Sequence, residues 1–335
     1  MAAKATTLIK RALPWLLSLV IVGYLFWSVD MVAVVSAVQG ADLQALFWIM
    51  LLSAPVILAA DAATLWLLFA RLMARIPYRE VLAIKGVSYF FNAITYSAGT
   101  GGIAYLVHRR LNAEGRAGPD GKPISGFLHA LSALLWLNFI DLIALVLLIA
   151  AGLLLASDHV PVELASRLPY VLVGFAFITV GALMYWRLGV DFLVLGRLRS
   201  WRIFRAFADA TMAEYGVMVA SRVAFVGVYI VLTWLLLPTF QIEVPFLLLL
   251  VYMPIGTFVQ IIPASVSGLG AVQVVMIALY APHVAQSIPD GEAQVLAFTT
   301  FLGPATTFVR LLLGYVFLKT VMTRVMGDVS LDAAS

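Results

Sequence analysis

The chain has 335 residues, of which 63% are hydrophobic and 11% charged, and its formal net charge is +4. Soluble domains contain about 45–50% apolar and about 25% charged residues, so this composition excludes a soluble protein and indicates an integral membrane protein. The absence of cysteine excludes disulfides, thiol catalysis and cysteine-based metal sites. Apolar runs of about 20 residues predict membrane-spanning helices. The arginines lie in short loops, which favours a role in topology and contact with anionic lipid over binding of nucleic acid.

The first half of the chain predicts three spans. They cover Leu13–Val29, Leu46–Ala70 and Phe127–Ala156. The loop between the first two spans contains Asp30 and Asp42 and no basic residue, so we expect it on the non-cytoplasmic side.

A broken apolar segment, Glu80–Arg110, lies between the second and third spans. Its middle is SAGTGG (Ser97–Gly102), and closely spaced glycines weaken a helix by about 1 kcal/mol each. Both flanks are basic, with Lys85 before the glycines and Arg109 after them. Because a full crossing normally has one basic and one non-basic side, this segment is predicted to be a re-entrant hairpin that enters and leaves on the cytoplasmic side.

The second half of the chain predicts three further spans. They cover Leu168–Trp186, Gly216–Leu237 and Ala293–Leu318. The spacing of aromatic and charged residues in Trp201–Tyr215 predicts an amphipathic helix on the membrane surface.

A second broken segment, Val244–Pro282, is interrupted by IPASVSGLG (Ile262–Gly270) and has no basic residue at either flank. It is predicted to be a re-entrant hairpin from the non-cytoplasmic side, in which Pro263 ends the first leg. The second leg, Ala271–Ala281, is about 16 Å long as a helix, or about half the hydrocarbon thickness.

The distribution of charge supports this topology. Of the 21 lysines and arginines, 18 fall on the predicted cytoplasmic side, two lie within spans and one is outside. Both termini are expected in the cytoplasm and the protein in a bacterial cytoplasmic (inner) membrane. The sequence thus predicts an all-α polytopic membrane protein with about six full spans and two re-entrant helical hairpins.

The two halves, residues 1–157 and 158–335, each contain three spans and one hairpin in opposite orientations. They predict an inverted-topology repeat within a single integral membrane domain that lacks a soluble catalytic domain. In such repeats the broken segments meet at the midplane and form a substrate site. We therefore expect the two glycine loops to face each other across a polar cavity bordered by Asp141 and Arg310.

Four charged residues fall within predicted spans, where charge is unfavourable and usually faces the bundle interior. They are Asp61, Asp141, Arg222 and Arg310. Two interpretations stay open: a head-group or charge-relay site, centred on Asp141 and Arg310, or structural ion pairs that neutralise one another.

The hairpins supply the other candidate residues of a lipid path. Arginines at the inner rim could bind a lipid phosphate or only set topology, and amides could line the cavity or hold helices together. The candidates are Asn92, Gly99, Gly101, Gly102, Arg109, Arg110, Asp141, Pro263, Ser265, Gly268, Gly270, Gln273 and Arg310, with Asp61 and Arg222 as secondary charges. No catalytic residue, metal ligand or cofactor is expected.

These motifs resemble a known family. The carriers are FFNAITYSAGTGGIAYLVHRR (Phe90–Arg110), IPASVSGLGAVQ (Ile262–Gln273), DLIAL (Asp141–Leu145) and Arg310. The chain is similar to the flippase-like family typified by the transmembrane region of lysylphosphatidylglycerol synthases, whose relatives include hopanoid- and glycolipid-associated proteins. In two places it departs from the family pattern. Gln273 stands where the family has an acidic residue, and no proline precedes the first glycine pair.

The resemblance implies lipid translocation or handling of lipid-linked intermediates. The leading hypothesis is a flippase that moves an anionic or glycosylated lipid (a phospholipid, a hopanoid or a lipid-linked sugar). One alternative is a membrane scaffold that recruits lipid-biosynthesis enzymes. The other is an intramembrane lipid-modifying enzyme, which is disfavoured because no catalytic motif is present. The expected partners are membrane lipids and lipid-biosynthesis enzymes.

Overall fold

The computed structural model describes residues 31–94, 96–113, 126–188, 201–261 and 270–321. Within these ranges the chain forms α-helices, short 3-10 helices and one isolated β-bridge. The prediction of an all-α fold is confirmed for the described residues.

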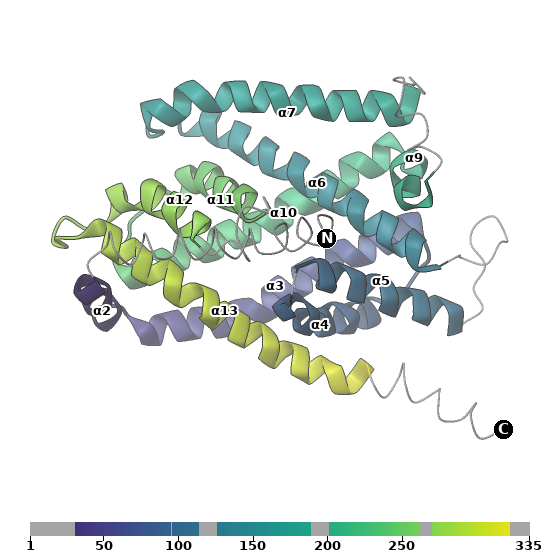
Figure 1. Cartoon of the computed structure of the whole chain (residues 1–335), viewed down its shortest axis with the longest axis horizontal. Coiled ribbons are helices and arrows are strands. Elements are labelled where there is room, and N and C mark those ends of the chain that lie inside the picture. Colours follow the sequence, from purple (N-terminus) through teal and green to yellow (C-terminus); the bar gives the residue numbers. More distant parts are fainter. Residues whose placement is uncertain (1–30, 95, 114–125, 189–200, 262–269, 322–335) are drawn as a thin grey trace, which may run out of the picture. The chain divides into compact units, whose positions relative to one another are not determined.

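Five of the helices are long and apolar enough to cross a membrane (Figure 1). They are α3 (Leu43–Leu72), α6 (Gly126–Leu155), α7 (Val162–Leu188), α10 (Met212–Leu236) and α13 (Gly291–Val321). Each coincides with one predicted span. The remaining predicted span, Leu13–Val29, lies outside the described residues.

The first broken segment folds into two packed helices, α4 (Tyr78–Ile94) and α5 (Tyr96–Ala113). An ion pair joins its two ends. Arg110 Nε donates to Glu80 Oε2 at 2.7 Å, and Arg110 Nη2 donates to Glu80 Oε1 at 3.1 Å. Because Glu80 lies in the first turn of α4 and Arg110 in the last turn of α5, the two helices run antiparallel as a hairpin. Its entry into the membrane from one side stays a prediction.

The prediction that SAGTGG forms the turn of this hairpin is wrong, because α5 already begins at Tyr96. Two of its three glycines serve helix packing instead. A Cβ atom on Gly102 would lie 2.5 Å from Phe91 Cδ2, and one on Gly99 would overlap Asn92 Oδ1. Residues three apart share one helix face, so these two glycines let α5 approach α4 closely.

The second broken segment also forms a helix pair, α11 (Phe246–Ile261) and α12 (Ala271–Tyr280). Its ends are joined through the backbone. Glu243 N donates to His283 O at 2.8 Å, and Ala285 N donates to Gln241 O at 3.1 Å. The 10 residues of α12 are too few to cross about 30 Å of hydrocarbon, as the sequence predicted.

The predicted surface helix Trp201–Tyr215 is wrong as a single element. The chain forms a 3-10 turn, η1 (Arg202–Phe204), and a short helix, α9 (Arg205–Asp209), before α10 starts at Met212. The interruption has a local cause. Thr211 Oγ1 accepts from Glu214 N at 3.3 Å, and Glu214 Oε2 accepts from Thr211 N at 2.6 Å. This reciprocal capping box fixes the start of a new helix.

A helix that was not predicted, α2 (Met31–Gln39), occupies the predicted loop after the first span. Its nine residues are uninterrupted by glycine or proline, and it ends immediately before Gly40. Asp42 then begins α3, because its Oδ1 accepts a hydrogen bond from Ala45 N at 2.9 Å. An acidic residue expected to mark only topology is therefore also a helix N-cap.

The chain divides into two compact units. Unit 1 comprises Met1–Leu51, Leu148–Ala165 and Tyr229–Thr306, and unit 2 comprises Leu52–Leu147, Ser166–Val228 and Thr307–Ser335. Hairpin α4–α5 belongs to unit 2 and hairpin α11–α12 to unit 1. The described part of unit 1 contains no lysine or arginine, whereas it contains six acidic residues: Asp42, Asp158, Glu163, Glu243, Asp290 and Glu292.

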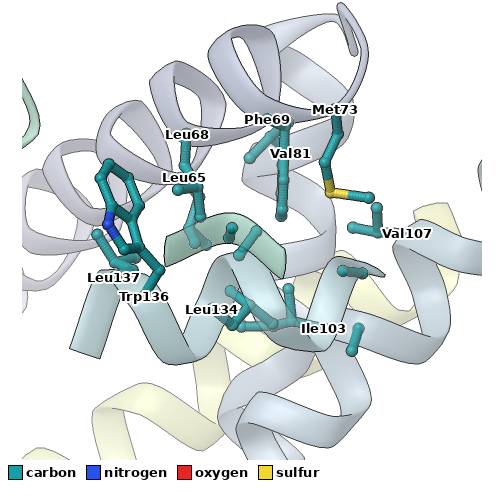
Figure 2. Packing of buried hydrophobic residues seen from close by; sticks show 14 of the residues in the cluster. Leu65, Leu68, Phe69, Met73, Val81, Ile103, Val107, Leu134, Trp136 and Leu137 are labelled. Carbon is teal, nitrogen blue, oxygen red and sulfur yellow. The ribbon is translucent and has the colours of Figure 1, made fainter. Parts of the chain in front are cut away.

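The hydrophobic core of unit 2 joins α3, α4, α5 and α6. Figure 2 shows Leu65 and Phe69 of α3 pointing toward the helix that carries Leu134. Phe69 and Trp136 are completely buried. In a membrane such contacts stabilise through close van der Waals packing, since lipid tails are as apolar as the side chains.

The glycines of α5 provide a matched test of this packing. We expect Gly102→Ala to lower the stability of unit 2 by about 1–3 kcal/mol, because its Cβ has no room beside Phe91. Gly101→Ala is the control, because no atom lies within 4 Å of a Cβ there, and alanine favours the helix by up to about 1 kcal/mol. The measurement is the midpoint of thermal unfolding in detergent. Equal midpoints for the two variants would contradict this role.

Candidate functional site

Three of the four predicted intramembrane charges meet in unit 2. Arg222 of α10 donates from Nε to Asp141 Oδ1 of α6, and from Nη1 to Asp61 Oδ1 of α3 at 3.4 Å. The other oxygen of Asp61, Oδ2, forms an ion pair with Lys85 Nζ of α4 at 2.7 Å. Four helices thus contribute one charged side chain each to a continuous chain of ion pairs.

The ion-pair chain is nearly shielded from solvent. The side chains of Lys85, Asp61 and Arg222 are 13%, 14% and 10% exposed. A charge buried without a partner is strongly destabilising. Within a membrane span, a charged side chain also raises the free energy of insertion. The described residues contain no group of three or more histidine, aspartate and glutamate side chains that could hold a metal ion. The four side chains of the ion-pair chain combine charges of both signs.

Neighbouring contacts fix the two helices that carry the central pair. Thr64 of α3 donates to the carbonyl of Ala60 at 3.2 Å, and its Oγ1 lies 3.1 Å from Ser221 Oγ of α10. The guanidinium carbon of Arg222 lies 4.2 Å from the centre of the Phe225 ring, which favours the cation through the ring quadrupole. These contacts hold Arg222 in place between its two carboxylates.

Arg310, the fourth predicted charge, lies near the same aromatic ring as Lys85. Its guanidinium carbon lies 5.7 Å from the centre of the Tyr89 ring, and Lys85 Nζ lies 6.0 Å from that ring centre. Tyr89 is only 5% exposed, so its ring forms a buried surface shared by two cations.

Two glycines allow α4 and the end of α13 to cross closely beside this ring. A Cβ on Gly86 would lie 2.5 Å from Phe317 Cδ2, and one on Gly314 would lie 3.0 Å from Phe90 Cδ2. Each glycine therefore receives a phenylalanine from the opposite helix, which is the way small residues let membrane helices approach. Lys85 and Tyr89 flank Gly86 on α4, and Arg310 lies one turn before Gly314 on α13.

The other predicted site residues lie apart from the charge cluster or outside the described residues. Asn92, Gly99 and Gly102 form the close contact between α4 and α5, and Arg110 pairs with Glu80. Gly101 and Arg109 are half-buried on α5. Pro263, Ser265 and Gly268 fall outside the described residues, and the cavity between the two glycine loops stays a prediction.

Gly270 and Gln273 form the start of α12 in unit 1. Gly270 has φ 89°, a conformation that side-chain-bearing residues rarely adopt. Gln273 Oε1 accepts a hydrogen bond from Gly270 N at 2.7 Å. The glutamine where the family resemblance implies an acidic residue is thus a helix cap in this chain.

Lys85 and Tyr89 were not predicted as site residues. Lys85 was assigned to the basic flank of the hairpin, and the structure corrects this, because Lys85 lies within α4 and pairs with Asp61. A signal was available, since Lys85 and Tyr89 are four residues apart and therefore share one face of a helix.

The sequence matches a known family. The family model described as the lysylphosphatidylglycerol synthase TM region matches residues 12–314. The chain belongs to this family. No curated protein and no solved structure matches the chain. Membership together with the five apolar helices identifies an integral membrane protein whose family is connected with lipids.

A double-mutant cycle can test the interaction between Asp61 and Lys85. We expect Asp61→Asn to destabilise the protein by about 3–5 kcal/mol, because it leaves the Lys85 ammonium buried without a carboxylate. Adding Lys85→Met is expected to recover much of this loss, since Arg222 keeps Asp141 as its partner.

Thermal unfolding of the wild type, both single variants and the double variant gives the coupling energy. Asp209→Asn is the control, because the Arg205–Asp209 pair is about half exposed and such pairs contribute at most about 1 kcal/mol. Additive effects of Asp61→Asn and Lys85→Met would show that the two side chains do not interact.

A second pair of variants tests the cap on α12. Gln273→Leu removes the acceptor for Gly270 N and is expected to destabilise the protein by about 1 kcal/mol. Gln273→Glu keeps an acceptor and places negative charge at a helix N-terminus, which is favourable, so it is expected to match the wild type. The measurement is again the unfolding midpoint. A Gln273→Leu variant as stable as Gln273→Glu would exclude the capping role.

Proposed function

We propose that the protein is a flippase that moves lipids with an anionic or glycosylated head group between the leaflets of the cytoplasmic membrane. The observation that carries the proposal is the buried cluster of Lys85, Asp61, Arg222 and Asp141, with Arg310 beside it. Charges within spans mark substrate paths in transport proteins. A polar head group needs such a path, because bare hydrocarbon offers it no hydrogen-bond or charge partners.

The two helix hairpins support a transport function over a purely structural one. Proteins that combine full spans with broken helical segments use the broken segments to line a path for the substrate. Hairpin α4–α5 contributes Lys85 and Tyr89 to the charge cluster, so one of the two hairpins is directly connected with it. By analogy with inverted repeats, movement of one half of the chain against the other would expose the site to each leaflet in turn.

The distribution of basic residues supports the proposed orientation. All described lysines and arginines belong to unit 2, and the described part of unit 1 has none. Since basic residues gather on the cytoplasmic side of membrane proteins, we assign the described loops of unit 1 to the non-cytoplasmic side. We propose the bacterial inner membrane as the location, and a transporter without enzymatic activity.

Reconstitution tests the proposal. We expect fluorescent phospholipids and glycolipids to cross the bilayer faster in vesicles that contain the purified protein than in empty vesicles. Asp141→Asn is expected to slow this movement, because it leaves Arg222 with one carboxylate in place of two. Arg202→Gln is the control, since Arg202 is exposed on η1.

The assay measures the fraction of labelled lipid that an impermeant quencher reaches from outside, as a function of time. Equal rates in protein-containing and empty vesicles, for every lipid tested, would reject the flippase and favour the scaffold hypothesis.

A further inference from the structure

An open groove lies in unit 1 where α10 ends. Its volume is about 480 Å³, and it is lined by Trp234 and Leu235 of α10, Pro238 of the 3-10 helix η2 (Leu237–Phe240), and Ile242–Pro245 before α11. Small-molecule sites in proteins are hollows of about 300–1,000 Å³, so the groove has the size of such a site. All of these residues belong to unit 1, whereas the charge cluster around Asp61 belongs to unit 2.

The segment that carries Glu243 is held in place by its backbone. Glu243 N donates to His283 O at 2.8 Å, and Ile242 forms an isolated β-bridge with Val284. Ile242 and Val244 are buried, whereas Glu243 between them is exposed. Since successive side chains of an extended segment point in opposite directions, the carboxylate of Glu243 points away from the core of unit 1.

The groove carries negative charge. Glu243 is the one charged residue among the described residues that line it, and its carboxylate has no hydrogen-bond or ion-pair partner within the described part of the chain. Unit 1 as described contains six acidic residues and no lysine or arginine. An anion such as the phosphate of a lipid head group would meet no described basic residue in this unit, whereas a cation would be attracted.

An exposed aromatic ring accompanies this carboxylate. Trp234 is 45% exposed, and its ring centre lies 5.9 Å from that of Phe246 at an interplanar angle of 84°. Because Phe246 is the first residue of α11, this edge-to-face contact holds the indole ring beside the groove. Tryptophan is the aromatic side chain that attracts cations most strongly. The groove thus combines a carboxylate, an indole ring and an otherwise apolar lining.

These properties select one class of cation. A metal ion such as Ca²⁺ takes about six to eight oxygen ligands, and a primary ammonium has three N–H donors to satisfy. One carboxylate in an apolar groove provides too few acceptors for either. A quaternary ammonium has no N–H donor, and its methyl groups bind well against aromatic surface.

We infer that this groove binds a soluble quaternary ammonium cation with an aromatic or aliphatic body, whose positive charge lies against the Glu243 carboxylate and the Trp234 ring. The inference goes beyond lipid transport, because binding here requires neither the charge cluster nor the movement of a lipid. The described loops of unit 1 are those that we assign to the non-cytoplasmic side, so the cation would enter from that side.

Titration of the purified protein in a non-ionic detergent with benzyltrimethylammonium tests the inference. Its neutral isostere, neopentylbenzene, has the same shape with carbon in place of the charged nitrogen. We expect the cation to bind with a dissociation constant below about 1 mM. The isostere is expected to bind at least about fivefold more weakly, because neither the carboxylate nor the ring attracts it electrostatically. Saturation-transfer NMR measures both, with empty micelles as the background.

Two pairs of variants locate the site. Glu243→Gln is expected to weaken binding of the cation by roughly twofold to fivefold, the effect of an exposed ion pair, and to leave binding of the isostere unchanged. Glu292→Gln is the matched control, because Glu292 is an exposed acidic residue of the same unit that does not line the groove. Trp234→Leu is expected to weaken binding by roughly threefold, whereas Trp234→Phe and Trp48→Leu, at another exposed tryptophan of unit 1, retain most of it.

The unfolding midpoint of Glu243→Gln is expected to match that of the wild type, because its carboxylate has no described partner, so weaker binding is separated from misfolding. Equal affinities for the cation and the isostere, or equal affinities of Glu243→Gln and Glu292→Gln for the cation, would overturn the inference. Short-chain phosphatidylcholine is expected to compete poorly. Competition as strong as that of benzyltrimethylammonium would assign the groove to a lipid head group and would also overturn it. None of these measurements depends on lipid movement, so the flippase proposal is tested separately.

Discussion

The carboxylate of Asp61 is the contact on which the rest of the cluster depends. It pairs with Lys85 through one oxygen and with Arg222 through the other, and so links the first hairpin to α3 and α10. Without it, Lys85 would lose its carboxylate in surroundings that penalise unpaired charge. The close crossing of α4 and α13 at Gly86 and Gly314 then decides what else can reach the cluster. Because Gly86 and Gly314 have no Cβ atoms, the two helices can approach closely, and Arg310 lies beside the ring of Tyr89.

The same contacts bear on the two initial interpretations of the intramembrane charges. Asp61, Asp141 and Arg222 do neutralise one another as ion pairs, which is the structural interpretation. The pairing is uneven, however, because one carboxylate is shared between two cations from different helices.

Hydropathy predicted five described spans to within a few residues, because a run of about 20 apolar residues has few alternatives to a membrane helix. The prediction of helix breaks from the positions of glycines was less reliable. The sequence placed the turn of the first hairpin at SAGTGG, whereas Gly99 and Gly102 are packing positions inside α5. Glycine permits both uses, and only the neighbours Asn92 and Phe91 decide between them. The capping box at Thr211 and Glu214 was readable from the sequence, but the amphipathic spacing around it obscured it. Lys85 was missed because a lysine at a hairpin flank is equally well explained by topology.

The two hairpins are closed in chemically different ways. The ends of α4 and α5 are joined by the side chains of Glu80 and Arg110, which are 21% and 29% exposed, whereas the ends of α11 and α12 are joined by backbone hydrogen bonds around Glu243 and His283. Dissolved ions screen a partly exposed ion pair but hardly affect an amide hydrogen bond. A higher salt concentration is therefore expected to weaken the closure of hairpin α4–α5 more than that of hairpin α11–α12. A pair of segments that look equivalent in hydropathy becomes an adjustable element and a fixed one, and it is the adjustable element that carries Lys85.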